Sequence, residues 1–393
     1  MLKLRASYGK VGNDKLGGTR FLYITNVSMG GGTIPSLGRG QSVIMGKLGN
    51  ENISWEIAYK QNYGIDLGLF NELTLSFDYF REHRKDILIN RGTVPEIQGV
   101  PLGNLPKVNM GVVDNSGFEI EARYRKTINS DWSFAVNGNF AYNKNTQKDM
   151  DEPIRSDDFA YRYRMTGYSI GQDFGYKIDY SNGNGFINTQ EELERAQAMY
   201  KVGVPRMGDF LYQDLNGDGY IDEKDMAPIL YSNVPRITYG FGAQIFFRDF
   251  DLAFHFSGIA KASRCYNAWG AVEYSNEGIY NDWHLNAWTP ERYAAGEKIT
   301  YPALSTKMNT NHLPNDFFIM NRSFLRLKNI EIGYSLPKSL LRKIQVQKVR
   351  VYMTGNNLLT WKKIKNNSID PEQNWEANYP LTKMLNFGVN VVF

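Results

Sequence analysis

The chain has 393 residues, a formal net charge of +4 and an aromatic content of 14%, with 25 Tyr and 22 Phe. Charged residues of both signs are spread along its whole length, which argues against a basic stripe and therefore against nucleic acid as a partner. The four histidines show no ligand spacing and the single cysteine, Cys265, has no partner for an internal disulfide, so a zinc site and a disulfide scaffold are both disfavoured.

The first half of the chain predicts long strands. At the N-terminus, apolar residues alternate with polar ones over residues 2–8, which gives one apolar and one polar face. The same alternation predicts a second strand over residues 53–69, a tight turn at 70–72 and a third strand from residue 73 towards 90. This composition and period are typical of an all-β protein.

Further strands follow the same pattern. A shift in the apolar phase around Lys328 and Asn329 predicts a β-bulge. The last strand is apolar and aromatic and runs to Phe393. The later strands are expected over residues 118–124, 132–142, 237–247, 252–258, 325–336, 349–353 and 385–393.

Tight and very long connections alternate between these strands. The tight ones are predicted at residues 70–72, 127–131, 248–251 and 337–345, and the long ones at 10–52, 91–113, 147–235, 265–320 and 360–382. No apolar run of about 18 residues is present, so no transmembrane helix is expected, whereas a transmembrane strand needs only about 9–11 alternating residues. Since outer-membrane barrels carry short turns at one end and long loops at the other, this pattern favours part of such a barrel.

The long segment 147–235 contains one helical signature. Thr189 precedes a run of helix-forming residues, and Glu192 stands three positions later, which is the spacing of a capping box. We expect a short surface helix that packs through Leu193 and Ala196.

The same segment contains a calcium-type loop, DLNGDGYIDEKD, over residues 214–225. Oxygen-bearing groups recur at positions 1, 3, 5, 7, 9 and 12 of the loop, the spacing at which a 12-residue loop can surround Ca²⁺. Gly219 occupies position six, where the backbone turns sharply. We predict a structural calcium ion and no sensor role. The expected ligands are Asp214, Asn216, Asp218, the backbone carbonyl of Tyr220, Asp222 and Asp225.

Aromatic residues gather in a later loop. Trp269, Tyr280 and Trp283 are candidate contacts to a substrate or a partner, because aromatic rings stack on sugars and also anchor protein interfaces. Glu119 and Glu121 share one strand face at a separation compatible with acid–base chemistry. Their alternation with Arg123 and Arg125 favours a charge-balanced wall, so no catalytic residue is assigned.

Ten segments, in this order, resemble the C-terminal part of SusC/RagA-type TonB-linked (TonB-dependent) outer-membrane transporters. Together they cover essentially the whole chain. They are LKLRASYGKVGN, WEIAYKQNYGIDLGLFNELTLSFDYFREHRKDIL, VVDNSGFEIEARYRK, GDFLYQDLNGDGYIDEKD, VPRITYGFGAQIFF, NAWTPERY, SFLRLKNIEIGYSLPKSLL, VRVYMTGNNLLTW, IDPE and NFGVNVVF.

The resemblance implies about ten C-terminal strands of a 22-stranded antiparallel transmembrane barrel with long extracellular loops, in the bacterial outer membrane. It implies TonB-driven import of glycans or peptides, with a SusD-like surface lipoprotein as partner and outer-membrane lipid around the strands. Residues 1–393 are expected to form only this barrel portion, with the calcium loop in the insertion at 147–235. The plug, the TonB-contacting segment and a signal peptide are absent from the sequence, so we expect a fragment of a longer transporter.

Two other functions compete with this interpretation. A secreted calcium-dependent β-rich lectin or adhesin would also use an acidic loop and exposed aromatic rings. A glycoside hydrolase that uses Glu119 and Glu121 is the weakest hypothesis.

Overall fold

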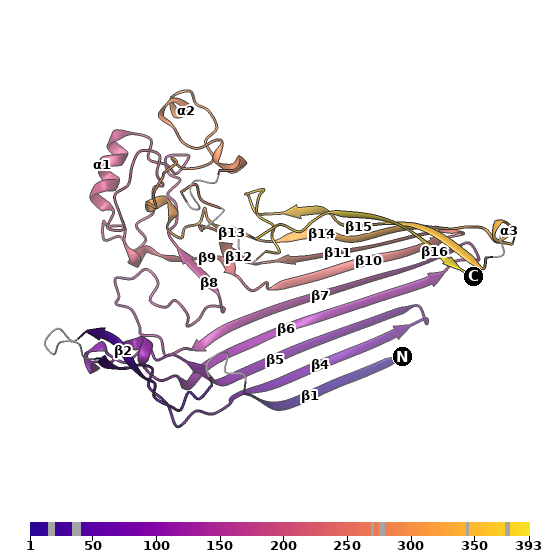
Figure 1. The fold of residues 1–393 in the computed structure, drawn as a ribbon, viewed down its shortest axis with the longest axis horizontal. Helices are drawn as coiled ribbons and strands as arrows, with labels where there is room; N and C mark the ends of the chain where they lie inside the picture. Colours follow the sequence, from indigo (N-terminus) through magenta and orange to yellow (C-terminus); the bar gives the residue numbers. More distant parts are fainter. Residues whose placement is uncertain (15–19, 34–40, 269–270, 275–279, 343–345, 374–377) are drawn as a thin grey trace.

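In the computed structural model, the chain is described over residues 1–14, 20–33, 41–268, 271–274, 280–342, 346–373 and 378–393. Among these residues, ten antiparallel strands form one sheet in the order β1-β4-β5-β6-β7-β10-β11-β14-β15-β16 (Figure 1). The all-β class and the ten long strands predicted from the sequence are confirmed. The strands of this sheet are Leu2–Asn13 (β1), Glu56–Leu69 (β4), Leu73–Ile89 (β5), Val108–Thr127 (β6), Trp132–Asp149 (β7), Ile237–Phe247 (β10), Phe250–Ala260 (β11), Phe324–Ser335 (β14), Lys348–Lys362 (β15) and Met384–Val392 (β16).

Smaller elements lie in the connections. Three two-stranded sheets pair β2 with β3, β8 with β9 and β12 with β13. The short strands are Val27–Thr33 (β2), Gln41–Met45 (β3), Gln172–Gly175 (β8), Ala227–Ser232 (β9), Ser263–Cys265 (β12) and Ile319–Asn321 (β13), and the helices are Gln190–Met199 (α1), Pro290–Ala294 (α2) and Lys338–Leu341 (α3).

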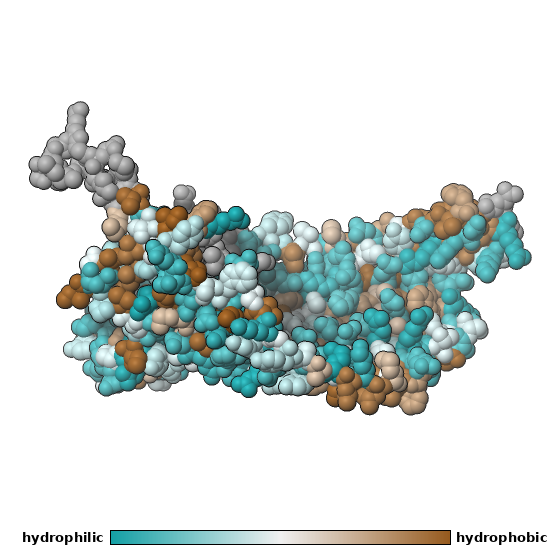
Figure 2. Space-filling view, turned by 90° about the horizontal axis from the view of Figure 1, so that it is seen from below, coloured by the Kyte–Doolittle hydropathy of each residue, from teal (hydrophilic) through white to brown (hydrophobic). Residues whose placement is uncertain are grey.

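One face of the large sheet is apolar and exposed. Leu4, Ile65, Phe77, Ile120 and Phe140 lie opposite one another on five successive strands. Leu4 is 70% exposed, although its burial would be favourable. Figure 2 shows hydrophobic residues along the lower rim of the half that the strands form. No helix among the described residues is long and apolar enough to cross a membrane.

The other face of the sheet carries paired charges. Arg5 lies 2.9 Å from a carboxylate oxygen of Asp66 and 2.8 Å from one of Asp78. Glu119 lies opposite Asp78 in the strand register, and Glu121 lies two residues away on the same face. The candidate acid–base pair therefore belongs to a charged sheet face.

The two ends of the sheet differ, as the loop pattern predicted. The turn after β4 is tight because Phe70 and Asn71 both have positive φ, and the Glu72 amide donates to the Leu69 carbonyl at 3.1 Å. The turn after β6 is held by the side-chain oxygen of Asn129, which accepts hydrogen bonds from two following amides. Both chain termini lie at this tight-turn end, and the long connections project from the opposite end (Figure 1).

Several predicted bounds were wrong, for identifiable reasons. Residues 53–55 precede β4, because the backbone of Ser54 is hydrogen-bonded to the side chain of Asn109. β6 begins at Val108 and not at 118, because its polar first half pairs with β5 and β7. The bulge is confirmed, since the register between β14 and β15 shifts between Leu327 and Asn329.

Candidate functional site in the long loops

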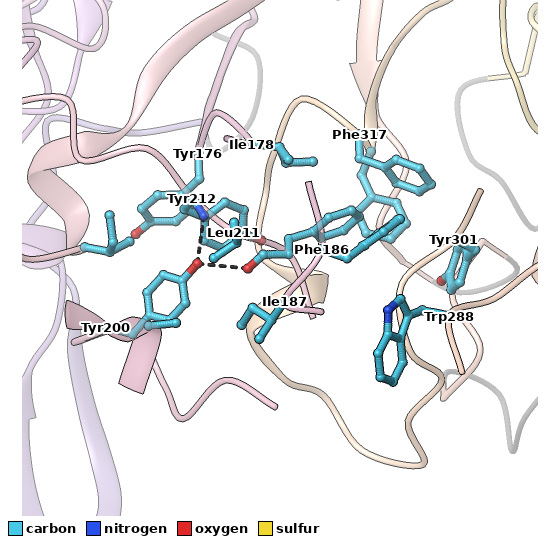
Figure 3. Packing of buried hydrophobic residues seen from close by; sticks show 14 of the residues in the cluster. Tyr176, Ile178, Phe186, Ile187, Tyr200, Leu211, Tyr212, Trp288, Tyr301 and Phe317 are labelled. Atoms are coloured by element: carbon cyan, nitrogen blue, oxygen red, sulfur yellow. Dashed lines mark hydrogen bonds between the residues drawn. The ribbon is translucent and has the colours of Figure 1, made fainter. Parts of the chain in front are cut away.

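Two long connections fold together into one compact unit. We call the described residues of segments 172–232 and 263–321 the loop domain; the first segment lies between β7 and β10, and the second between β11 and β14. The loop domain has an aromatic core of its own (Figure 3). Its largest buried members are Tyr176, Ile178, Phe186, Ile187, Tyr200, Phe210, Leu211, Tyr212, Trp288, Tyr301, Phe317 and Phe318.

Helix α1 supports one side of this core and begins as the sequence predicted. The Thr189 side chain accepts from the Glu192 amide at 3.2 Å, and the Glu192 carboxylate accepts from the Thr189 amide at 3.2 Å. Leu193 and Ala196 pack against the core. The capping box and the packing face are therefore both confirmed, and the helix delivers Tyr200 at its C-terminal end.

Tyr200 joins two parts of the core through its hydroxyl group. That hydroxyl donates to the Phe210 carbonyl at 2.8 Å and accepts from the Tyr212 amide at 2.7 Å (Figure 3). Burial raises the pKa of the Tyr200 and Tyr212 hydroxyls, so both stay neutral hydrogen-bonding groups.

A buried ionic cluster lies deeper in the second segment. Nε2 of His312 lies 3.1 Å from both carboxylate oxygens of Glu273, and the Tyr301 hydroxyl donates to the same carboxylate at 2.7 Å. All three residues have no exposed surface. Burial opposes ionisation of Glu273, but hydrogen bonds from His312 and Tyr301 outweigh it and hold the pKa of Glu273 below its ordinary value. The cluster therefore ties together distant parts of the segment 263–321.

The predicted calcium loop adopts the expected tight turn. Asp214 accepts the Gly219 amide at 2.8 Å, and Gly219 has a φ of +85°. Asp225 is fully buried and accepts the amides of Leu215 and Asp222 at 2.8 and 2.9 Å. Burial raises the pKa of Asp225. These bonds fix the two ends of the loop to each other.

Lys224, a residue of the same loop, lies beside its carboxylates. Nζ of Lys224 lies 2.8 Å from Asp158, 3.7 Å from Asp218 and 3.9 Å from Asp222. Asn216 donates its side-chain amide to Asp218 at 2.9 Å. Within the described parts of the chain, no three His, Cys, Asp or Glu side chains converge in a way that could hold a metal ion. A cation bound among the predicted donors would therefore have to displace Lys224 from Asp218 and Asp222.

The three aromatic candidates have different surroundings. Trp269 lies outside the described residues. Tyr280 is 55% exposed at the surface. Trp283 is half-buried, and its ring centroid lies 4.9 Å from that of Phe317 and 5.2 Å from that of Tyr301. Trp283 also lines a pocket.

That pocket has a volume of about 470 Å³, and we call it the loop pocket. Its aromatic lining comes from Tyr180, Phe186, Phe210, Trp283 and Phe317. The remaining lining residues are Asn184, Ile299, Thr300 and Lys365. It therefore draws on both segments of the loop domain and on the connection between β15 and β16.

Lys365 belongs to a segment that directly follows β15, residues 363–373, which we call the strap. Arg326 of β14 is 2% exposed and binds both carboxylate oxygens of Asp370 at 2.8 Å. Arg326 and Lys328 also pair with Glu372. Ion pairs to β14 thus fix the strap.

Sequence patterns had not identified the ionic cluster or most of the pocket lining. Glu273 and His312 are 39 residues apart, and no local spacing links them. The only available signal was the density of aromatic residues in both long segments.

Comparison with known proteins agrees with the fold. The sequence profile of the TonB dependent receptor-like, beta-barrel family matches residues 1–358. TonB-dependent receptor P3 of Formosa agariphila is 28% identical over 425 residues, which cover all of this chain and 39% of that protein. TonB-dependent receptor SusC of Bacteroides thetaiotaomicron is 26% identical over 413 residues, covering all of this chain and 37% of that protein.

A solved structure of the RagAB peptide transporter has a similar fold. It matches with a TM-score of 0.71 and 21% identity, covering all of this chain and 41% of that chain. The chain thus spans about two fifths of the length of the proteins that it matches.

Proposed function

The chain belongs to the family of TonB-dependent receptor β-barrels of the SusC/RagA type, and on that premise we propose that it contributes to the import of oligosaccharides or peptides. The family is one of transporters and not of enzymes, and its place is the bacterial outer membrane. The observation that carries the proposal is the sheet with one exposed apolar face and one charged face, since a barrel strand meets lipid on one side and a polar interior on the other.

The orientation follows from the same architecture. The tight-turn end would face the periplasm and the loop domain would face the outside (Figure 1). Energy would come from TonB through a part of the transporter that precedes the strands described here. A SusD-like lipoprotein would cover the loop domain. We include peptides because the fold is similar to that of the RagAB peptide transporter. We include oligosaccharides because of the resemblance to the SusC/RagA family.

A structural calcium ion in the loop 214–225 is part of this proposal. Asp214, Asn216, Asp218, Asp222, Asp225 and the Tyr220 carbonyl would hold it, and the ion would stiffen a long outer loop. Calorimetry with CaCl₂ should detect binding by the chain in detergent micelles. Asp214→Ala or Asp218→Ala should weaken binding while the strands stay intact, whereas Asp157→Ala, at an exposed neighbouring carboxylate, should not. Absence of any calcium signal in the unaltered protein would refute the site.

The alternative of a secreted calcium-dependent lectin or adhesin depends on the same loop. It requires a protein that is stable in water, which the exposed apolar rows of the sheet disfavour.

The import function is tested in cells that produce the transporter containing this chain. Fractionation should place it in the outer membrane. Uptake of labelled oligosaccharides or peptides should fall on deletion of its gene and on collapse of the proton-motive force. Recovery of the protein in the soluble fraction, or unchanged uptake of both substrate classes, would overturn the proposal.

A further inference from the structure

We propose that a groove on the lipid-facing side of the sheet, at its long-loop end, binds a phosphate-bearing lipid of the outer leaflet. The groove, which we call the rim groove, is lined from Tyr239 of β10 to Trp361 of β15 and has a volume of about 470 Å³. None of its described lining residues also lines the loop pocket. The choice of the outer leaflet rests on the orientation of the strands under the proposed import function.

The rim groove opens on the apolar face of the sheet. Tyr239 lies opposite Phe140 and so continues the exposed apolar row that crosses the first five strands. Leu325 and Trp361 follow in the same row, after Gly258. Residues directly opposite each other on neighbouring strands share a face. The side chains of Tyr239, Leu325 and Trp361 therefore point toward lipid.

Gly258 gives the groove its depth, because it places no side chain between Tyr239 and Leu325. The Tyr239 ring lies close over this glycine, since a Cβ added there would be 2.6 Å from Cζ of the tyrosine. The Tyr239 hydroxyl donates to the Phe324 carbonyl at 3.1 Å, which fixes the ring. An acyl chain entering the groove would thus meet a preformed surface.

Lys261 places one cation at the groove. Its Nζ lies 5.8 Å from the centroid of the Tyr142 ring. Tyr142 lies opposite Ile237, which lines the groove two residues before Tyr239 on β10. Both rings are therefore on the lipid-facing side, and the Lys261 ammonium is on that side as well.

Lys363, the first residue of the strap, supplies a second cation. Its amide donates to the Ser323 carbonyl at 3.0 Å, which extends the pairing of β15 with β14 by one residue. Alternation along the strand places the exposed Lys363 side chain on the same face as Trp361. The groove is thus apolar along the strands and basic at its outer end.

The charge of the lining favours an anionic ligand. No acidic residue is among the described residues that line the groove. Lys362 also belongs to the lining, but its Nζ already donates to the carbonyls of Asn366, Asn367 and Ile369 at 3.1, 3.0 and 2.7 Å. A ligand phosphate would therefore be held by Lys261 and Lys363, since lysine binds phosphate as a point charge.

The position of the groove selects a lipid over a soluble anion. Towards the tight-turn end, Phe241, Leu327 and Leu359 continue the apolar face directly below it. Exposed aromatic residues near the ends of barrel strands, such as Trp361, mark the boundary between lipid tails and headgroups. A lipid would place its phosphate on the lysines and its acyl chains along these strands, whereas a soluble anion would leave the apolar lining uncovered.

The test measures lipid binding by native mass spectrometry on the transporter that contains this chain, purified in detergent micelles. The probes are monophosphoryl lipid A, the same lipid after removal of its phosphate, and inorganic phosphate. The phosphorylated lipid should bind as a single copy. The dephosphorylated lipid should bind at least about tenfold more weakly, because it loses two lysine contributions of about fivefold each. Inorganic phosphate should not displace the lipid.

Substitutions locate the site. Lys261→Gln and Lys363→Gln should each weaken binding of the phosphorylated lipid about fivefold and leave the dephosphorylated lipid unchanged. Lys144→Gln is the matched control and should change neither affinity, because Lys144 is exposed two residues beyond Tyr142 on β7 but does not line the groove. Ala260→Trp should abolish binding of both lipids by filling the groove, while the strands stay intact because barrel rims accommodate aromatic residues.

Three results would overturn the proposal. They are equal affinity for the two lipids, equal weakening by Lys144→Gln and by the two groove substitutions, and displacement of the lipid by inorganic phosphate. Each of them leaves the import function intact, because that function is judged by fractionation and uptake.

Discussion

The sheet exposes large apolar side chains, whereas the loop domain buries them. In the loop domain, Ile187, Tyr301 and Phe318 have no exposed surface. In the sheet, Leu4 is 70% exposed and Phe387 of β16 is 79% exposed. Complete burial of one such side chain contributes about 1.5–3 kcal/mol. The loop domain therefore carries its own core as a water-soluble domain does, whereas the sheet depends on lipid to cover its apolar face.

Charged groups show the same contrast. The hydrogen-bonded pair of Glu273 and His312 has no exposed surface, whereas Arg5 in the sheet keeps about a third of its side chain exposed. Exposed pairs contribute about 0–1 kcal/mol, while removal of one partner from a buried pair is far more costly. Substitutions should thus affect the two regions by different amounts and in different media.

The largest expected effect is on the buried pair. Glu273→Ala should destabilise the loop domain by about 3–5 kcal/mol, because it leaves His312 and Tyr301 buried without their acceptor. Hydrogen exchange should accelerate in residues 176–226, while amides of β10 and β11 keep their protection. Glu297→Ala is the control, since this exposed partner of Arg292 should cost less than about 1 kcal/mol. Equal loss of protection in the strands would show that the two regions are one cooperative unit.

The next effect tests the lipid-facing surface. Phe241→Arg should destabilise the chain by about 2–4 kcal/mol in lipid vesicles, since a charge would enter the apolar layer. Phe241 is 42% exposed and stacks on Phe256. Urea unfolding in vesicles measures the change. Gln244→Arg, on the opposite face of β10, should be tolerated. If both variants behave alike, the two faces of the sheet do not differ as proposed.

A fall in pH should also distinguish the loop domain from the sheet, with a smaller effect than the two substitutions. The pKa of Glu273 in the folded chain lies below its ordinary value of 4.5. Its ionised form thus stabilises the loop domain above about pH 4.5, and this contribution is lost as the pH falls through the folded pKa. Hydrogen exchange of the loop domain should accelerate below pH 4.5, and Glu273→Gln should flatten this dependence. An unchanged pH profile in that variant would exclude Glu273 as the group responsible.

Sequence patterns identified the sheet because its information is local. Alternation along each strand sets which face meets lipid, and the turn at Phe70 and Asn71 needs only neighbouring residues. The capping box at Thr189 is equally local. The polar first half of β6 was missed because its alternation is weak, although its partners on both sides hold it in the sheet.

The loop domain could not be predicted in the same way. Tyr212 donates to the Thr310 carbonyl, 98 residues away, and Arg326 meets Asp370 across 44 residues. The calcium loop depends both on local sequence patterns and on long-range contacts. Its turn at Gly219 was predicted from spacing, whereas the position of Lys224 among three carboxylates depends on how the whole segment folds.

The smallest expected effect tests how far cooperative unfolding extends within the loop domain. Thr189→Ala should cost about 1 kcal/mol, because it removes the N-cap of α1. Because α1 places Tyr200 in the core, hydrogen exchange should also accelerate at Phe210 and Tyr212, which both hydrogen-bond to the Tyr200 hydroxyl. Gln190→Ala, at an exposed position of the same helix, should change stability by less than about 0.5 kcal/mol. Faster exchange confined to α1 would mean that the helix frays by itself. Faster exchange across the core would mean that the loop domain opens as one unit, as its shared aromatic core requires.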